Sequence, residues 1–237
     1  MKKWIMAVFF LFLTGCSHIR VLNPQSDTGK DQAFLIWLSL AIMLLVLVIV
    51  FVLWGRFVWK YRESKQKNNP NLPTDITENK LYETIWTVGP ILLLVILAIP
   101  TISITYGQSP VSSTDKTKSH VNPASEGTHI QVTAQQFKWT FEHKGGKKES
   151  GVLVMPADTK VYFHLHSKDV IHSFWIPELA GKSDVMPHEK LIYEIKNAKS
   201  GTYEGKCAEY CGVDHAKMRF SVKVVPKKEY EKYIKEK

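Results

Sequence analysis

The sequence predicts two transmembrane helices followed by an all-β domain, and three observations lead to this fold class. Two long uncharged apolar runs lie at residues 33–54 and 85–104, short stretches of alternating apolar and polar residues follow, and no long amphipathic helical pattern accompanies them. The 237 residues are 45% hydrophobic and carry a formal charge of +9, which excludes a disordered or collagen-like chain. Three cysteines are too few for a disulfide-stapled miniprotein, and the apolar runs exclude a plain cytosolic enzyme.

The amino terminus has the layout of a secretory signal. A basic start precedes the uncharged residues 4–13, which are too few to span a bilayer comfortably, and Gly15 and Cys16 follow them. A cysteine directly after small residues resembles the bacterial lipoprotein signal, in which this cysteine becomes the lipidated first residue. We therefore predict a signal peptide over residues 1–15 and a lipid anchor at Cys16. An uncleaved amino-terminal helix is the alternative.

The two apolar runs predict a transmembrane hairpin within residues 16–107. At about 1.5 Å per residue, the run 33–54 extends over roughly 33 Å, which is enough to cross a hydrocarbon core. Pro90 and Pro100 are expected to kink the second helix, and membrane spans tolerate such kinks. Buried core helices of a soluble protein are the alternative explanation of the two runs.

The distribution of positive charge predicts the orientation of the hairpin. The segment between the runs is rich in basic residues, namely Arg56, Lys60, Arg62, Lys65, Lys67 and Lys80. The stretch before the first run carries only Arg20 and Lys30. The positive-inside rule places the middle loop in the cytoplasm and both flanks outside, as a lipidated Cys16 also requires. We predict a multi-pass protein of a bacterial cell membrane whose C-terminal domain, residues 108–237, is extracytoplasmic.

Period-two alternation predicts short, half-buried strands in this C-terminal domain. The alternating stretches are 130–134, 137–141, 161–165, 191–195 and 220–224, and turn signals occur at 145–146, 155–158 and 198–201. Residues 108–128 resemble a linker in composition. Several short strands at this spacing favour a sandwich or a barrel. The charged tail after Val225 is expected to form at most a short, mostly solvated helix.

A motif near the C-terminus predicts a metal centre. Residues 207–218 read CAEYCGVDHAKM, and an isolated histidine, His172, lies upstream. The two cysteines, the two histidines His172 and His215, and Met218 form a soft ligand set that favours copper. Zinc would gain nothing from the methionine, and a mononuclear blue-copper site needs only one cysteine. Two bridging thiolates, with one histidine per metal, would instead hold two copper ions close together.

A disulfide between Cys207 and Cys211 is the alternative, since an oxidising outer compartment permits it. Such a bridge would close only a small loop, would stabilise little, and would leave His215 and Met218 unexplained. The remaining histidines are interpreted more simply. His164 and His166 share one strand face and could bind metal, but we expect surface or packing roles for them. His129, His143 and His188 show no partners in the sequence.

On these residues the chain resembles subunit II of the haem–copper cytochrome c oxidases, the family that carries the binuclear CuA centre. The resemblance implies that the all-β domain is a cupredoxin-like sandwich. It also implies that six positions ligate copper, namely His172, Cys207, the backbone carbonyl of Glu209, Cys211, His215 and Met218. The Glu209 carboxylate is further implied to reach a magnesium ion at the boundary with subunit I.

The resemblance also implies roles for residues outside the metal motif. Glu83 in the stretch ETIWT matches an acidic residue at the mouth of a proton path into subunit I. The alternative is a helix-start acid favoured by the helix dipole. Trp139 and Phe137 are possible points of electron transfer from a c-type cytochrome, although the family usually has tryptophan at position 137. The nearby Lys144, Lys147 and Lys148 disfavour a cationic donor, so we expect docking mostly through apolar contacts.

These implications define the expected function. The chain would take single electrons from a c-type cytochrome and relay them to subunit I, which reduces dioxygen and pumps protons. Its expected partners are subunit I, other oxidase subunits and the lipid bilayer, and we expect no nucleic acid. The alternatives are the CuA subunit of a nitric-oxide reductase and a membrane-tethered copper carrier. A quinol oxidase subunit II is disfavoured, because that branch of the family lacks the copper ligands.

Overall fold

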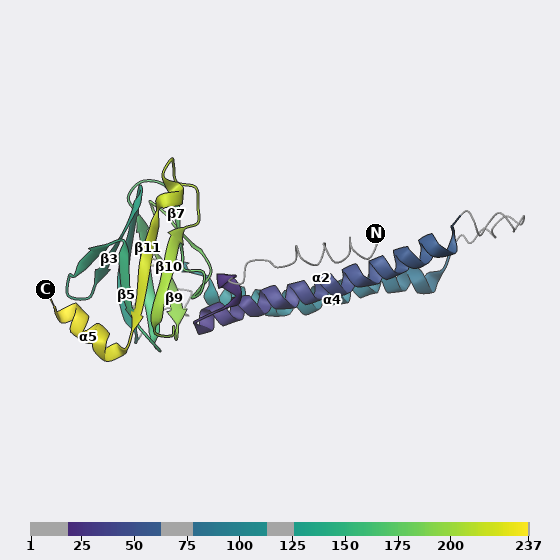
Figure 1. The fold of residues 1–237 in the computed structure, drawn as a ribbon, viewed down its shortest axis with the longest axis horizontal. Helices are drawn as coiled ribbons and strands as arrows, with labels where there is room; N and C mark the ends of the chain where they lie inside the picture. Colours follow the sequence, from purple (N-terminus) through teal and green to yellow (C-terminus); the bar gives the residue numbers. More distant parts are fainter. Residues whose placement is uncertain (1–18, 63–77, 113–125, 237) are drawn as a thin grey trace, which may run out of the picture. The chain divides into compact units, whose positions relative to one another are not determined.

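The computed structural model of the chain describes residues 19–62, 78–112 and 126–236. The expected signal peptide, Cys16 and parts of the cytoplasmic loop and of the linker lie outside these residues. The chain divides into two compact units, one comprising Phe34–Tyr106 and the other comprising Met1–Ala33 with Gly107–Lys237 (Figure 1). We describe each unit by itself.

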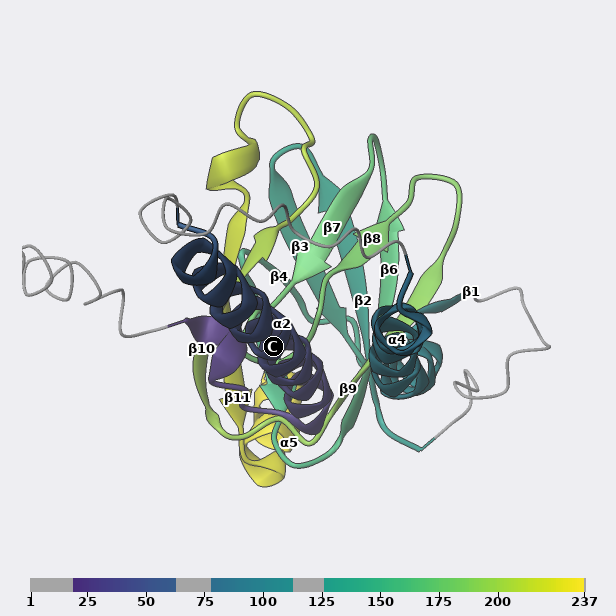
Figure 2. The ribbon, with the colours of Figure 1, turned by 90° about the vertical axis from the view of Figure 1, so that its right-hand side faces the viewer.

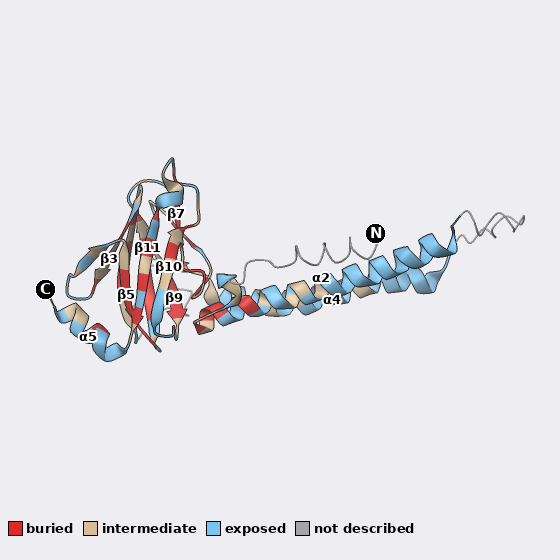
Figure 3. Cartoon of the chain, viewed as in Figure 1, coloured by how far each residue is buried: buried red, intermediate tan, exposed pale blue. Residues whose placement is uncertain are grey.

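The two expected spans are confirmed as long helices. The first lies within α2 (Asp27–Lys60) and the second within α4 (Lys80–Gln108), which includes Pro90 and Pro100. Both helices are long and apolar enough to cross a membrane, and no residue in the most apolar stretch of either is buried (Figure 3). Core helices of a soluble domain would be covered, so the exposed apolar side chains indicate a lipid-facing surface.

The other unit is a sandwich of two sheets (Figures 1 and 2). The six-stranded sheet has the order β1-β9-β6-β2-β3-β4, and the five-stranded sheet has the order β5-β11-β10-β7-β8. The strands of the first sheet are β1 (Val111–Ser112), β2 (Thr128–Gln135), β3 (Lys138–His143), β4 (Lys148–Ser150), β6 (Lys160–Ser167) and β9 (Leu191–Lys196). Those of the second are β5 (Val152–Pro156), β7 (His172–Trp175), β8 (Ser183–Val185), β10 (Gly201–Cys207) and β11 (Arg219–Val225).

All five alternating stretches overlap with strands, because their apolar residues face the core between the sheets. The pairs β2–β6 and β5–β11 are parallel, and the other pairs in the described part of the chain are antiparallel. The core contains an aromatic cluster of Trp139, Phe141, Phe163, Phe174 and Phe220, each at most 3% exposed. This cluster extends to the strand ends that carry the metal motif, where Trp139 packs against His172, so the ligands are attached to the packed core of the domain.

Two local expectations were wrong. The turn signal at 155–158 is misplaced, since Met155 and Pro156 belong to β5 and the turn begins after them. A proline at the end of an edge strand costs no ladder hydrogen bond, which explains why the strand tolerates it. Phe137 is not a strand residue either, because Gln136 and Phe137 form the turn between β2 and β3.

The segment before the first apolar run packs on the sandwich. The Ser26 hydroxyl donates a hydrogen bond to the Leu179 carbonyl. The amide of Asn197 donates to the Asp27 carboxylate at 2.7 Å. Arg20 and Arg219 both pair with Glu204 and hold the pKa of that carboxyl below its ordinary value. Residues 19–33 are therefore part of the same unit as the sandwich, and they also lead into α2.

The C-terminal tail forms the expected short helix, α5 (Lys227–Lys235), but one of its faces is docked. Tyr230 is buried, and its hydroxyl lies 3.0 Å from Nδ1 of His143. Lys147 donates hydrogen bonds to the carbonyls of Tyr233 and Glu236. The helix closes the end of the sandwich opposite to η2 (His215–Lys217) (Figures 1 and 2).

Acidification is expected to weaken the docking of α5. Burial lowers the pKa of His143, Glu149 opposes this shift, and Lys147 adds to it. Because the pKa is about 6.5 in the unfolded chain, the unfolded state binds more protons as the pH falls below that value. Stability is therefore complete above about pH 6.5 and decreases below it. Burial also lowers the pKa of His164, which acts in the same direction.

Comparison of the full chain with His143→Gln isolates the contribution of His143. Thermal unfolding in detergent should show a steeper loss of melting temperature for the unmodified chain than for the variant between about pH 7 and about pH 5. Equal slopes would contradict this assignment.

Candidate metal centre

Three elements of the sandwich converge on the metal motif, namely β7, β10 and η2. His172 begins β7 and Cys207 ends β10, and these strands are adjacent because Cys207 pairs with Phe174. The chain then folds back through η2 to Met218, whose carbonyl accepts a hydrogen bond from the Cys207 amide at 2.9 Å. Residues distant in sequence are thus fixed at one end of the domain by strand pairing.

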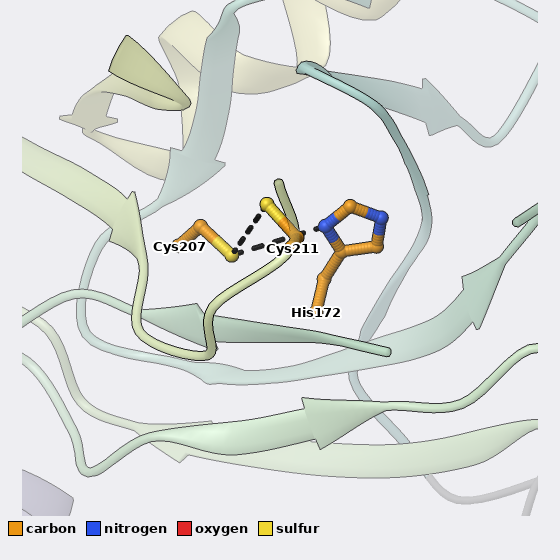
Figure 4. Close-up of side chains that lie close together, drawn as sticks. All are labelled: His172, Cys207 and Cys211. Carbon is orange, nitrogen blue, oxygen red and sulfur yellow. Dashed lines mark hydrogen bonds between the residues drawn. The ribbon is translucent and has the colours of Figure 1, made fainter. Parts of the chain in front are cut away.

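The two cysteines and two histidines predicted as ligands are brought together. The Sγ atoms of Cys207 and Cys211 lie 3.9 Å apart (Figure 4). Nδ1 of His172 lies 3.8 Å from Sγ of Cys207, and Nδ1 of His215 lies 3.6 Å from Sγ of Cys211. The two sulfur atoms therefore form the centre of the group, with one imidazole beside each.

The two weaker expected donors complete the same arrangement. The backbone carbonyl oxygen of Glu209 lies 3.2 Å from Sγ of Cys207, and Sδ of Met218 lies 3.7 Å from Sγ of Cys211. Each cysteine sulfur is thus accompanied by one imidazole nitrogen and one uncharged weak donor. The side chains of His172, Cys207, Cys211 and Met218 are all buried.

The distances favour metal ligation over a disulfide. A disulfide requires about 2.05 Å between sulfurs, and both cysteines are free in this structure. A metal–thiolate bond is about 2.3 Å long, so one ion can contact two sulfurs 3.9 Å apart. Ligand atoms that share an ion through bonds of this length are about 3–4 Å apart, as these donors are. The soft donor set fits copper, as the sequence predicts.

The two buried thiols would ionise only if a cation were bound between them. Burial, together with the neighbouring Cys207, raises the pKa of Cys211 to about 12. Two buried thiolates in contact would repel each other without a positive charge between them. A metal ion would provide that charge and displace the thiol protons.

Asp169 orients His172, a role that was not predicted from the sequence. Its carboxylate lies 2.8 Å from Nε2 of His172, so the other ring nitrogen faces Cys207. Partial burial opposes ionisation, but hydrogen bonds from the Gln136 and Val170 amides and from His172 keep the pKa of Asp169 below its ordinary value. A carboxylate three residues before a ligand histidine is the signal that would have identified it.

The two candidate electron-transfer residues differ in accessibility. Trp139 is 0% exposed and packs edge-on against His172, with ring centroids 6.1 Å apart. A docked protein cannot touch it. Phe137 is partly exposed, and its ring lies so close to Gly212 that a Cβ atom there would approach it to 3.0 Å. Phe137 is therefore the accessible aromatic residue of the pair.

The lysines expected near this position lie elsewhere. Lys144, Lys147 and Lys148 follow the far end of β3, and Lys147 holds the C-terminal helix. The six residues of β3 separate Phe137 from Lys144, and seven residue steps along a strand correspond to about 23 Å. The expectation that they shape a docking surface at the metal centre was wrong, because proximity in sequence is not proximity along an extended strand.

The surface around the metal loop is apolar, with its charges paired. Tyr210 is 76% exposed and Val213 is 91% exposed. Val170 and Ile171, which directly precede His172 in the sequence, are also exposed. Glu209 lies 3.5 Å from Lys182, and Asp214 lies 2.8 Å from Lys217.

Glu83 belongs to the other unit and lies in the first turn of α4. Its amide donates a hydrogen bond to the carbonyl of Asn79, which is the ordinary geometry of a helix start.

The chain combines two apolar helices with a β-sandwich that clusters thiolate, imidazole and thioether donors. These features place it in the class of membrane-anchored, cupredoxin-like copper-binding proteins. The family model for the transmembrane domain of cytochrome c oxidase subunit II matches residues 23–104, and the model for its periplasmic domain matches residues 147–225. The chain belongs to the cytochrome c oxidase subunit II family. Its C-terminal domain is therefore extracytoplasmic, and the chain is a subunit of a membrane oxidase.

Relatives within the family fall into two groups. A cytochrome c oxidase subunit 2 from Alkalihalophilus pseudofirmus is 34% identical, over 99% of this chain and 69% of the relative. A quinol oxidase subunit 2 from Bacillus cereus is 35% identical, over 95% of this chain and 76% of the relative. The solved periplasmic domain of subunit II of cytochrome oxidase from Bradyrhizobium japonicum is 26% identical, with a TM-score of 0.45, over 48% of this chain and 95% of that one. Because the sequence identity to the two groups is nearly equal, it does not distinguish a cytochrome from a quinol as the electron donor.

Proposed function

We propose that the chain is the CuA-bearing subunit II of a cytochrome c oxidase, which takes single electrons from a c-type cytochrome and passes them to the haem–copper subunit I. The observation that carries this proposal is the pair of cysteine sulfurs 3.9 Å apart, each with one imidazole and one weak donor beside it. Two copper ions held there would supply one-electron chemistry with the charge shared between them. The sulfurs of Cys207 and Cys211 would bridge the two ions.

The protein around the donors keeps their positions constant. His172 is fixed by the Asp169 carboxylate, and the Cys211 carbonyl accepts a hydrogen bond of 2.6 Å from the Gln136 side chain. The Cys207 amide is bonded to the Met218 carbonyl. Ligands held in this way move little when the metal charge changes, and that property suits electron transfer better than metal delivery, which needs an open site.

The apolar surface around the metal loop is the proposed docking site for the cytochrome. Tyr210 and Val213 supply exposed apolar area, and the charge of Asp214 next to Val213 is paired with Lys217. Docking would then depend on apolar contact rather than on steering by charge. Phe137, which lies against the metal loop, is the proposed aromatic residue through which the electron reaches the centre.

Three further roles are proposed from the family resemblance. Glu83 at the cytoplasmic start of α4 would collect protons for subunit I. The Glu209 carboxylate would contribute to a magnesium site at the subunit boundary. Its ion pair with Lys182 would have to break for this. Cys16 would carry a lipid.

A quinol oxidase subunit II is the second candidate, because relatives of that name are as similar as the cytochrome c oxidases. A quinol oxidase has no need of a buried thiolate pair with histidine and methionine donors. The complete donor set therefore favours the cytochrome as the electron source.

The donor is tested in the purified oxidase complex that contains the full chain. We expect rapid oxidation of a reduced c-type cytochrome and no direct oxidation of a soluble quinol. The variant Cys207→Ser should lose cytochrome oxidation, whereas a small reductant that delivers electrons directly to the haems should still support dioxygen consumption. Quinol oxidation that persists in Cys207→Ser would instead support the second candidate.

A further inference from the structure

Two histidines meet on the outer face of the six-stranded sheet, far from the metal centre. Ile130 and Val132 of β2 and Phe163 and Leu165 of β6 point into the core, so the residues between them point outward. His129 of β2 is one of these outward residues. His164 of β6 is another, and Gln131 is its register partner on β2. The strands are adjacent and parallel, which makes His129 and His164 diagonal neighbours.

The two imidazoles present their nitrogens to each other. Nδ1 of His129 lies 2.9 Å from Nε2 of His164. Two nitrogens that bind one ion at about 2.0–2.1 Å are about 2.9 Å apart when the angle at the metal is a right angle, and about 3.3 Å apart when it is tetrahedral. The observed separation is that of a hydrogen bond between the two rings, and it also equals the spacing of two imidazole nitrogens on one ion, so an ion could take the place of the shared proton.

The residues around the two histidines favour the binding of a cation. The ring of His129 stacks on Tyr162, with centroids 5.0 Å apart, which restricts its rotation. Partial burial of His164 and the neighbouring His129 lower the pKa of His164, so its ring is neutral at pH 7. A cleft of about 400 Å³ is lined by His129, Gln131 and Glu142, so small ions and water reach the pair from the side of His129.

The position separates this pair from the copper ligands. His129 is the second residue of β2, whereas Gln136, which bonds the Cys211 carbonyl, follows the other end of the strand. Seven residues along a strand correspond to about 23 Å. Binding at the pair is therefore measurable independently of the copper centre.

We propose that His129 and His164 form a second metal site, which binds one divalent cation of the zinc, nickel or copper(II) class, with water as the remaining ligands. Imidazole is a preferred ligand of all three ions, and magnesium and calcium, which prefer oxygen, are excluded by the donors. The proposal does not depend on the identity of the electron donor.

The test is calorimetric titration of Zn²⁺ into the full chain in detergent, with the copper centre loaded beforehand. We expect one zinc ion per chain at this site, with the copper spectrum unchanged throughout the titration. His164→Gln and His129→Gln should each weaken the zinc affinity at least about 10-fold. His166→Gln is the matched control, since it removes an imidazole from the same strand two residues away, and it should bind zinc like the unmodified chain.

Several results would overturn the proposal. These are no zinc binding by the unmodified chain, undiminished binding by both His129→Gln and His164→Gln, equal loss in His166→Gln, or zinc binding only with loss of the copper spectrum. Circular dichroism of each variant identifies any that fails to fold, and the other variant of the pair then decides the outcome.

Discussion

The variant Cys211→Ser is expected to lose the copper centre and, with it, electron transfer from the cytochrome. Sγ of Cys211 is the atom that joins the two halves of the site, because it lies 3.9 Å from Sγ of Cys207, 3.6 Å from Nδ1 of His215 and 3.7 Å from Sδ of Met218. A serine hydroxyl has a much higher pKa than a thiol and is a hard donor, so it cannot replace a bridging thiolate. We expect copper content and cytochrome oxidation to fall to background.

Met218→Leu provides the control for this substitution. Leucine preserves the apolar volume at a position that is completely buried, and both sulfurs that would bridge the metals remain. Copper should be retained with a shifted absorption spectrum and a changed reduction potential. Full copper content in Cys211→Ser, or complete copper loss in Met218→Leu, would contradict the assigned roles.

The variant Trp139→Ala is expected to destabilise the extracytoplasmic domain by about 3–5 kcal/mol. Trp139 is completely buried, and its ring centroid lies 5.7 Å from that of Phe174 and 5.5 Å from that of Phe220. Its indole N–H donates a hydrogen bond to the Met218 carbonyl at 3.4 Å. Truncation would leave a large cavity directly behind His172 and Met218, so copper affinity should fall together with stability.

Trp175→Ala is the matched control, because Trp175 is partly exposed at the end of β7 and contacts Lys206 through its ring face at 4.6 Å. An interaction of this kind contributes about 0.5–1 kcal/mol at accessible sites, so the loss should be much smaller. Unfolding of the full chain in detergent, followed by the fluorescence of the remaining tryptophans, measures both variants. Equal losses in the two variants would contradict the core role of Trp139.

Much of the fold follows from patterns that are local in the sequence. Uncharged runs identify α2 and α4, and alternation identifies β2, β3, β6, β9 and β11, because each of these strands has one face in the core. The short strand β7 does not follow from alternation, because three of its four residues are buried; only the family resemblance indicates a strand at His172. Strand β10 was missed for the opposite reason, because its sequence, GTYEGKC, is mostly polar.

The ligand set was predictable, but the residues that support it were not. Cys207, Cys211, His215 and Met218 lie within twelve residues, and their spacing alone indicates a soft metal site. Asp169 and Gln136 reach the centre only through the pairing of strands, and sequence spacing does not show such contacts. The same limit explains the misplaced lysines after β3 and the pair His129–His164, whose members are 35 residues apart.

The central claim is that the two cysteines bridge a pair of copper ions. Its most direct test is electron paramagnetic resonance of the full chain purified in detergent after copper loading, together with a determination of copper per chain. Two ions that share one unpaired electron give a seven-line pattern, since both nuclei split the signal equally, and the account predicts this pattern with two copper ions per chain. A four-line spectrum with one copper ion, zinc in place of copper, or an intact disulfide between Cys207 and Cys211 would contradict it.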